Sequence, residues 1–251
     1  MILKGIDASY GTLTDDIAKR LWAAGYRVFG QCLWTGAEQP PPRVINLRVA
    51  LNNGFIILGY ISVTSYMDGY YHVQRGRAGV PDDIWNALAL APIDVELNGI
   101  PNLTIRQAVD ALDKRKSIYT SYNCWVNKQG NPHDFTDCLL WNAGGKNWDR
   151  PDLAVPPDYV GGNFAKNPYG GWTVNQVVGE QWSGGSDVEG INADRDIFSE
   201  ELLVPTHMLT PDECLRVNLA NAKVLADDRD ADKLVGVLKY VYAVKGWLWP
   251  S

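Results

Sequence analysis

The feature that most constrains the fold is a series of eight short apolar runs, each rich in β-forming residues, separated by helical or irregular stretches. Eight strands joined by crossovers are typical of a parallel sheet that closes into a barrel. The chain has 251 residues, which suits one such domain. The sequence therefore predicts an α/β protein, an irregular β/α (TIM-like) barrel with eight strands and few helices. The predicted strands are Ile2–Ile6, Arg27–Leu33, Phe55–Val63, Ala91–Val95, Ser117–Thr120, Cys138–Ala143, Gln176–Glu180 and Gly190–Asp194.

The connections between these runs differ in their helical signal. Thr14 precedes two acidic residues, and Ile17 and Leu21 follow at helical spacing until Gly25, so we expect a helix there. The stretch from Trp148 to Gly171 is instead rich in Pro, Gly and Asn and predicts a long loop. Loops of this length are uncommon in compact domains and are often functional.

The chain after residue 204 has a different pattern. The segment Thr210-Pro-Asp-Glu213 is a capping box with proline at the first helical position. Apolar residues then recur at helical spacing in two stretches separated by acidic residues. We therefore predict two parts: a barrel over residues 1–204, and a helical hairpin over residues 205–251 that packs on the barrel. A role of the hairpin in anchoring the protein to its target or in oligomerisation is the alternative.

Four carboxylates stand at the ends of predicted strands. Asp7 follows the first strand, Asp94 and Glu96 end the fourth, and Asp194 ends the eighth. The active site of a β/α barrel gathers at the carboxyl ends of its strands. The barrel prediction therefore brings these four side chains to one mouth.

The tripeptide Asp94-Val95-Glu96 is the sharpest of these signals. Residues two apart on a strand face the same side, so both carboxylates point into one cleft. Ionising both costs Coulomb energy, which raises at least one pKa and leaves an acid beside a carboxylate. Glycosidic bond cleavage needs this combination: an acid for the leaving oxygen and negative charge beside the oxocarbenium-like centre.

Composition excludes several other functions. The net charge is −6 and the pI is about 5.1, so we expect no nucleic-acid partner. No apolar run approaches the roughly 20 residues of a membrane span. Three histidines and four widely spaced cysteines show no metal-ligand spacing, and we predict neither a metal nor a cofactor. The ten tryptophans are the compositional outlier, and aromatic rings stack on the apolar faces of sugars. Trp34 and Trp182 directly follow strands and are predicted sugar contacts.

Seven segments, in order along the chain, resemble the motifs of glycoside hydrolase family 25, the N-acetylmuramidase-type lysozymes. No single motif is specific to this family, but the occurrence of all seven in this order is. The matching segments are Gly5-Ile-Asp7-Ala-Ser9 (family G-x-D-x-S), Gly59-Tyr60 (G-x-Y-H-F), Ile93-Asp94-Val-Glu96 (D-x-E), Ile118-Tyr119-Thr120 (I-Y-T), Leu140-Trp141-Asn-Ala143 (L-W-x-A), Gln181-Trp182-Ser183 (W-Q-Y-S) and Ala193-Asp194-Arg195-Asp196-Ile-Phe198 (V-D-L-N-x-F).

The resemblance implies cleavage of the β-1,4 bond between N-acetylmuramic acid and N-acetylglucosamine in peptidoglycan. By position, it makes Glu96 the general acid and Asp94 the group that stabilises the developing charge. It also implies that Asp7 and Asp194 position the substrate and tune this pair. The residues that would line the cleft are Tyr60, Tyr119, Trp141 and Gln181.

The chain departs from the family pattern at three places. Ile61-Ser62 replaces the His-Phe that follows the third-strand tyrosine, and Trp34-Thr-Gly36 replaces the usual end of the second strand. Glu180 stands where the family has a tryptophan. These departures bear on the substrate rather than on the acid pair.

The sequence thus predicts a lysozyme that acts on the bacterial cell wall. Two other classes stay open: a non-catalytic barrel that binds glycan or a partner protein, and a chitin-type hydrolase. The run from Met1 to Asp7 shows no secretory signal peptide. This favours synthesis in the cytoplasm and release at host lysis, as for a bacteriophage endolysin, with a virion-associated protein as the second possibility.

Overall fold

The computed structural model describes residues 1–203 of the chain. The predicted hairpin over residues 205–251 lies outside the described residues and stays a prediction. Within residues 1–203, no helix is both long and apolar enough to cross a membrane.

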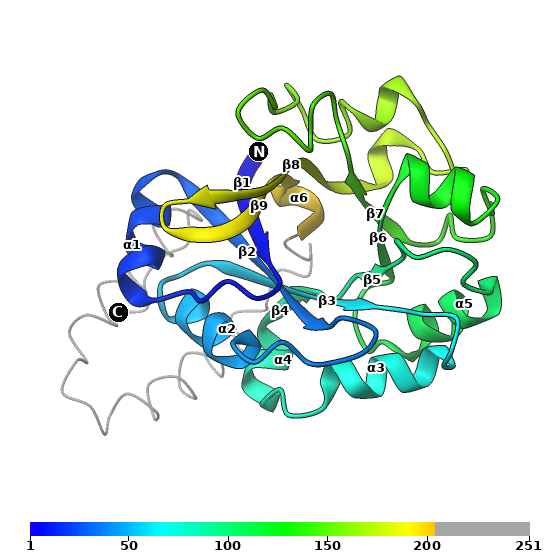
Figure 1. The fold of residues 1–251 in the computed structure, drawn as a ribbon, viewed down its shortest axis with the longest axis horizontal. Coiled ribbons are helices and arrows are strands. Elements are labelled where there is room, and N and C mark those ends of the chain that lie inside the picture. The colour runs from blue at the N-terminus through cyan, green and yellow to red at the C-terminus, as the bar shows by residue number, and fades with distance from the viewer. Residues whose placement is uncertain (204–251) are drawn as a thin grey trace, which may run out of the picture. The chain divides into compact units, whose positions relative to one another are not determined.

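Eight strands form a closed ring, which confirms the predicted irregular barrel with few helices (Figure 1). Pairing of β2 with β3 closes the ring. An additional short strand, β4 (Leu88–Leu90), pairs with the first half of β3 and lies just before the predicted fourth strand, of which only Ile93–Asp94 forms a strand of the ring. The ring strands are β1 (Ile2–Ala8), β2 (Tyr26–Trp34), β3 (Ile56–Ser62), β5 (Ile93–Asp94), β6 (Ser117–Ser121), β7 (Leu139–Ala143), β8 (Val177–Val188) and β9 (Ile191–Ser199).

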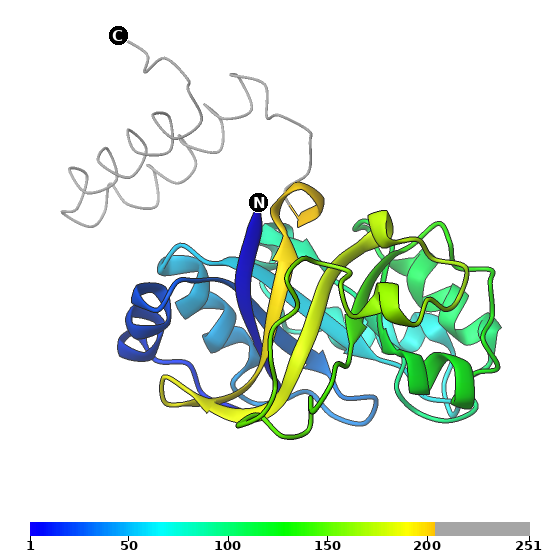
Figure 2. The same ribbon diagram turned by 90° about the horizontal axis from the view of Figure 1, so that it is seen from above.

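The expectation of an all-parallel barrel was wrong for the last strand. β9 runs antiparallel to both β8 and β1, because β8 and β9 form a hairpin with no crossover between them (Figure 2). The turn consists of Glu189 and Gly190, which have φ angles of 54° and 96°. Two positive φ angles are typical of the tight turn that joins antiparallel strands. The beginning of β9, rather than its end, therefore lies at the carboxyl ends of the parallel strands.

The helices lie outside the barrel, and the first of them begins at a capping residue. In α1 (Asp15–Ala23), the Thr14 hydroxyl accepts a hydrogen bond from the Ile17 N–H at 3.3 Å, as predicted from the cap pattern. The remaining helices are α2 (Arg43–Asn52), α3 (Gly69–Arg77), α4 (Asp82–Ala87), α5 (Asn102–Ala111), the π-helix η1 (Asn123–Lys128) and the short α6 (Glu200–Leu203).

The connection between β7 and β8 is the predicted long loop. It contains only two short 3-10 turns, η2 (Phe164–Lys166) and η3 (Val174–Gln176), and it arches beside β7 and β8 at the upper right of Figure 1. The buried Glu180 carboxylate of β8 accepts hydrogen bonds from the backbone N–H groups of Asn163 (3.0 Å) and Phe164 (2.8 Å). Glu180, one of the residues that depart from the family pattern, therefore anchors this loop.

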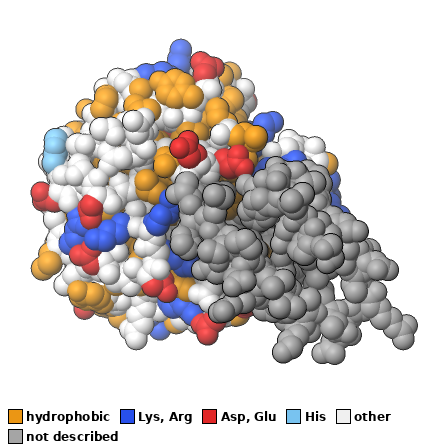
Figure 3. All heavy atoms as spheres, turned by 180° about the vertical axis from the view of Figure 1, so that it is seen from behind, with side chains coloured by type: hydrophobic (Ala, Val, Ile, Leu, Met, Phe, Trp, Pro, Cys, Tyr) orange, Lys and Arg blue, Asp and Glu red, His pale blue; other side chains and the backbone are white. Residues whose placement is uncertain are grey.

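The apolar core has two layers. The larger lies between the strands and the helices and includes Phe29, Leu21 and Ile105. The smaller fills the barrel interior around Trp141 and Phe198. A Cβ atom at Gly5 or Gly179 would come within 2.5 Å of the Phe198 ring, so these glycines of β1 and β8 leave room for it. On the face visible in Figure 3, basic side chains lie interspersed with acidic ones.

Candidate active site

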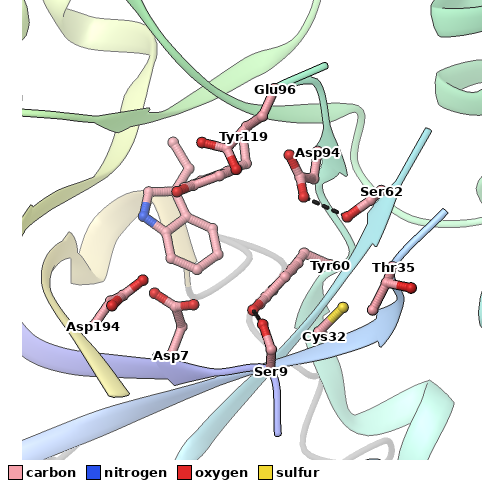
Figure 4. A pocket seen from close by; sticks show the side chains of 11 residues that line it. Asp7, Ser9, Cys32, Thr35, Tyr60, Ser62, Asp94, Glu96, Tyr119 and Asp194 are labelled. Atoms are coloured by element: carbon pink, nitrogen blue, oxygen red, sulfur yellow. Dashed lines mark hydrogen bonds between the residues drawn. The ribbon is translucent and has the colours of Figure 1, made fainter. Parts of the chain in front are cut away.

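A pocket of about 180 Å³ opens at the carboxyl ends of the parallel strands (Figure 4). It brings together the four carboxylates predicted from the sequence. Asp7 comes from β1, Asp94 from β5, Glu96 from the segment after β5, and Asp194 from β9. In Figure 4, Asp7 and Asp194 lie side by side, with Asp94 and Glu96 across the pocket from them.

Asp194 reaches the pocket for a different reason than predicted. The sequence suggested a parallel strand that ends at Asp194, but this residue is near the start of an antiparallel strand. Asp194 pairs in register with Asp7 across the β1–β9 ladder. The reversed direction of β9 thus brings the two carboxylates together.

Asp94 and Glu96 lie in an environment that favours their neutral forms. Burial, followed by the charge of Glu96, raises the pKa of Asp94 well above its usual value, while a hydrogen bond from the Ser62 hydroxyl opposes this. Burial also raises the pKa of Glu96, as does Asp194, whereas the Lys128 ammonium and the Tyr119 hydroxyl lower it. The pocket can therefore hold a carboxylic acid beside a carboxylate near neutral pH.

Gln181 links the two carboxylates of the other wall. Its side-chain N–H group donates to Asp7 Oδ2 at 3.1 Å and to Asp194 Oδ2 at 2.7 Å, and its carbonyl accepts from the Tyr119 hydroxyl at 2.7 Å. Burial, followed by the charge of Asp194, raises the pKa of Asp7 to about 8. Burial raises the pKa of Asp194 to about 6.

Three predicted aromatic residues line the pocket. Tyr119 and Trp141 meet edge to face with ring centroids 5.0 Å apart, and Tyr60 stacks beside Tyr119 at 6.2 Å. The Tyr60 hydroxyl also lies 3.0 Å from the Ser9 hydroxyl. This cluster presents rigid ring edges and hydroxyl groups to a ligand, as carbohydrate recognition requires.

The two predicted tryptophan contacts lie elsewhere. Trp34 is buried, and its indole N–H donates to His72 Nδ1 at 3.0 Å. Trp182 is half-buried, with the Arg195 guanidinium 5.9 Å from its ring centroid. Neither side chain lines the pocket, so their assignment as sugar contacts stays a prediction.

Sequence reasoning missed Asp196, a carboxyl group beneath the pocket. Asp196 lies two residues after Asp194 on β9, it is 1% exposed, and its Oδ1 accepts from the Trp141 indole N–H at 3.0 Å. Strand alternation from Asp194 could have placed it on the same face. The pocket-lining residues that were also missed are Ser9, Cys32, Thr35 and Ser62.

This arrangement suits general acid catalysis by carboxyl groups. Within residues 1–203, no group of His, Cys, Asp and Glu side chains is placed to hold a metal ion. The pocket holds several carboxyl groups that have different partners. These partners shift the pKa of each carboxyl group by a different amount. Such separation is how two chemically similar groups take the acid and the charge-stabilising roles.

No protein-family model and no curated protein matches the sequence. Several solved structures match the fold. A muramidase from Acremonium alcalophilum superposes with a TM-score of 0.60 at 19% identity, covering 80% of this chain and 97% of the other. A bacterial lysozyme from Streptomyces coelicolor superposes with a TM-score of 0.60 at 18% identity, covering 80% of this chain and 95% of the other. A family GH25 lysozyme from Aspergillus fumigatus superposes with a TM-score of 0.57 at 17% identity, covering 79% of this chain and 94% of the other. The chain therefore has the barrel fold of the family 25 glycoside hydrolases.

Proposed function

We propose that this protein is a peptidoglycan hydrolase that cleaves the β-1,4 bond between N-acetylmuramic acid and N-acetylglucosamine. The observation that carries the proposal is the convergence of Asp7, Asp94, Glu96 and Asp194 in one pocket at the carboxyl ends of the strands. The shared fold with proteins described as muramidases and lysozymes supports it.

In this proposal Glu96 is the general acid. It is the less buried member of the Asp94–Glu96 pair, and it reaches the open pocket, where it can protonate the leaving glycosidic oxygen. The hydrogen bond from the Ser62 hydroxyl favours the ionised form of Asp94 against the effect of burial, and in this form Asp94 supplies negative charge beside the anomeric centre. Asp7 and Asp194, held together by Gln181, position the sugar and influence the acid pair.

Two alternatives predict different products. A chitin-type hydrolase would cleave after N-acetylglucosamine, whereas a muramidase leaves a reducing N-acetylmuramic acid end. A non-catalytic glycan-binding barrel would release nothing, and the pocket with all four carboxylates disfavours it. Action on the cell wall after release from the cytoplasm, at host lysis, is the biological setting we propose, with a virion-associated protein as the second possibility. The likeness to the CTP1L endolysin supports the first setting (TM-score 0.54, 15% identity).

Mass spectrometry of fragments released from purified peptidoglycan tests the proposal directly. We expect fragments with reducing N-acetylmuramic acid ends from the wild-type protein. The Glu96→Gln variant keeps the side-chain shape but cannot donate the proton, so its rate should fall about 10²–10⁴-fold. Circular dichroism verifies that the variant is folded. Near-normal cleavage by a folded Glu96→Gln protein would remove Glu96 from its role.

A further inference from the structure

A separate hollow of about 670 Å³ opens within the long loop between β7 and β8. Its volume lies in the range of roughly 300–1,000 Å³ that is typical of ligand sites. Among the described residues, it shares no lining residue with the catalytic pocket, because its lining comes from the stretch between Lys146 and Lys166. None of these residues takes part in the proposed hydrolysis.

Much of the lining is apolar although it is exposed. Leu153 is 50% exposed, Val155 is 73% exposed and Tyr159 is 50% exposed. Two prolines, Pro156 and Pro157, lie between them in the chain and also line the hollow. Exposed apolar surface gathered in a groove marks a binding site. The lining therefore favours a ligand with apolar groups.

Two lysines add positive charge to the hollow. Neither Lys146 nor Lys166 forms an ion pair with another residue between 1 and 203. The Lys166 ammonium donates to Asn163 Oδ1 at 3.0 Å, and an ammonium group has two further N–H groups to donate. Within the described part of the chain, Asp158 is the single acidic residue of the lining. The excess of positive charge suits a ligand with carboxylate groups.

The hollow is formed before a ligand arrives. Glu180, which departs from the family pattern, accepts a hydrogen bond from the backbone N–H of Asn163 at 3.0 Å with its buried carboxylate. The Asn163 side chain donates to the Gly144 carbonyl at 3.3 Å. A Cβ atom at Gly162 would lie 3.5 Å from the Tyr159 ring, so this ring packs on the glycine backbone. A site fixed in this way loses little conformational entropy when a ligand binds.

We propose that this hollow binds the peptide that peptidoglycan carries on N-acetylmuramic acid. The inference rests on the proposed function and extends it from the glycan to the attached peptide. Such a peptide combines small apolar side chains with free carboxylates, and the lining matches both properties. A polymer of alternating alcohol and phosphate groups would match the lysines but would leave Leu153, Val155 and Tyr159 without an apolar partner.

The loop leads from the catalytic pocket to the hollow. The Gly144 N–H donates to the Gln181 backbone carbonyl at 3.0 Å, and the Gln181 side chain bonds to Asp7 and Asp194 in the pocket. Lys146, which lines the hollow, follows Gly144 by two residues. An extended peptide of five residues spans up to about 17 Å. A peptide whose sugar occupies the catalytic pocket can therefore reach the hollow.

Binding of three disaccharide ligands tests the peptide site. Each ligand is N-acetylglucosamine joined to N-acetylmuramic acid, and it carries no peptide, a peptide with free carboxylates, or the same peptide with amidated carboxylates. The wild-type protein can be titrated in a calorimeter because these disaccharides lack the bond that it is proposed to cleave. The ligand with free carboxylates should bind about 10-fold more tightly than the peptide-free one, which corresponds to one hydrogen bond between charged groups. Amidation should remove most of this gain.

Replacing both lysines isolates the effect of their charge. In the double variant Lys146→Met/Lys166→Met, affinity for the ligand with free carboxylates should fall about 10-fold, and binding of the peptide-free disaccharide should not change. The matched control Lys4→Met/Lys19→Met removes two exposed lysines outside the hollow and should alter none of the three affinities. Tyr159→Ala should weaken both peptide-bearing ligands about 3-fold, through loss of an aromatic contact.

Equal affinity of the wild-type protein for all three ligands would overturn the peptide site, as would an equal loss for all three in the double lysine variant. Tighter binding of poly(glycerol phosphate) than of the peptide ligand, lost in the same variant, would assign the hollow to a phosphate polymer instead. If the protein releases fragments from peptidoglycan but binds the three ligands equally, the peptide site alone fails. If it releases no fragments although the carboxylate dependence holds, the hydrolytic function alone fails.

Discussion

The indole N–H of Trp141 donates a hydrogen bond to Asp196 Oδ1 at 3.0 Å inside the barrel, and the second carboxyl oxygen of Asp196, Oδ2, is buried without a hydrogen-bond partner among the described residues. A carboxyl group buried in this way favours its protonated form. Burial is the main cause that raises the pKa of Asp196 well above its usual value, and the charges of Asp7 and Asp194 add to it. The neutral acid keeps the bond from Trp141 and leaves no buried negative charge in the barrel.

Asp196→Asn should therefore preserve the structure, because asparagine is neutral, has nearly the same shape and can accept from Trp141 through its carbonyl. The family motif that this segment resembles has asparagine at the same position. Asp196→Leu, which leaves the buried Trp141 N–H without its acceptor, should lower the free energy of unfolding by about 1–3 kcal/mol. Denaturant unfolding at one pH compares the two variants, and equal destabilisation by both would contradict the hydrogen-bond role.

The dependence of stability on pH gives a second outcome for Asp196→Asn. A carboxyl group whose pKa is raised in the folded state contributes stability that is fully present below its unfolded pKa and is lost as pH rises through its folded pKa. Asparagine cannot ionise and has no such loss. The melting temperature of Asp196→Asn minus that of wild type should thus increase from pH 4 to pH 8. A difference that stays constant would mean that Asp196 does not hold its proton in the folded protein.

Asp194→Asn should shift the alkaline limb of the pH–activity profile to lower pH. In the proposed mechanism Glu96 is the general acid, so activity should fall as pH rises through the pKa of Glu96. Asp194 raises that pKa through its negative charge, which is present above its own pKa of about 6. Removing the charge lowers the pKa of Glu96. The profile of kcat, measured with saturating substrate, reports this shift in the complex. An unmoved limb would restrict Asp194 to holding the sugar.

Lys128→Met should shift the alkaline limb of the pH–activity profile to higher pH. The Lys128 ammonium favours the ionised form of Glu96 and lowers its pKa. Methionine keeps a long apolar side chain without the charge, so the pKa of Glu96 should rise and activity should persist to higher pH. High salt screens exposed charges and should reduce the difference between variant and wild type. A limb displaced to lower pH would contradict the assigned electrostatics.

The parallel strands of the barrel could be predicted from the sequence because a local pattern of residues marks each strand. Strands such as β2 and β6 are short apolar runs, and Asp94 and Glu96 share a side through simple alternation. The direction of β9 was not predictable from composition. It depends on the Glu189–Gly190 turn, whose positive φ values permit a hairpin where a crossover was expected.

The site was predictable only where a residue's role follows from its place on a strand. Gln181 was expected as a cleft residue, but its link between Asp7 and Asp194 depends on the β8–β9–β1 register. Trp34 follows the predicted pocket strand, yet its indole turns to buried His72, which comes from α3. Such long-range pairings carry no local sequence signal.

Glu180→Leu should loosen the long loop between β7 and β8. The N–H groups of Asn163 and Phe164 lose their buried acceptor, which should reduce the free energy of unfolding by about 1–3 kcal/mol. Hydrogen exchange should accelerate around Asn163 more than at β1. The control Asp152→Ala removes an exposed carboxylate of the same loop and should change stability by less than about 0.5 kcal/mol. Unchanged exchange in Glu180→Leu would show that the loop is held by other contacts.

Gln181→Met should remove the hydrogen-bonded link between the carboxylates of Asp7 and Asp194. Methionine has a similar length but cannot donate to either carboxylate or accept from Tyr119, and all three bonds are buried or partly buried. The bonds from Gln181 lower the pKa of both Asp7 and Asp194, so both pKa values should rise in the variant.

Carbon-13 NMR titration of labelled aspartate carboxyl groups measures these two pKa values directly. We propose that Asp7 and Asp194 position the sugar. Because Gln181 no longer fixes them in the variant, kcat should also fall, by up to about 100-fold for a displacement near 1 Å. Gln74→Met on α3 changes an exposed glutamine in the same way and should alter neither quantity. If the titrations of Asp7 and Asp194 coincide with those of wild type while kcat falls, Gln181 acts on the substrate itself rather than through the carboxylates.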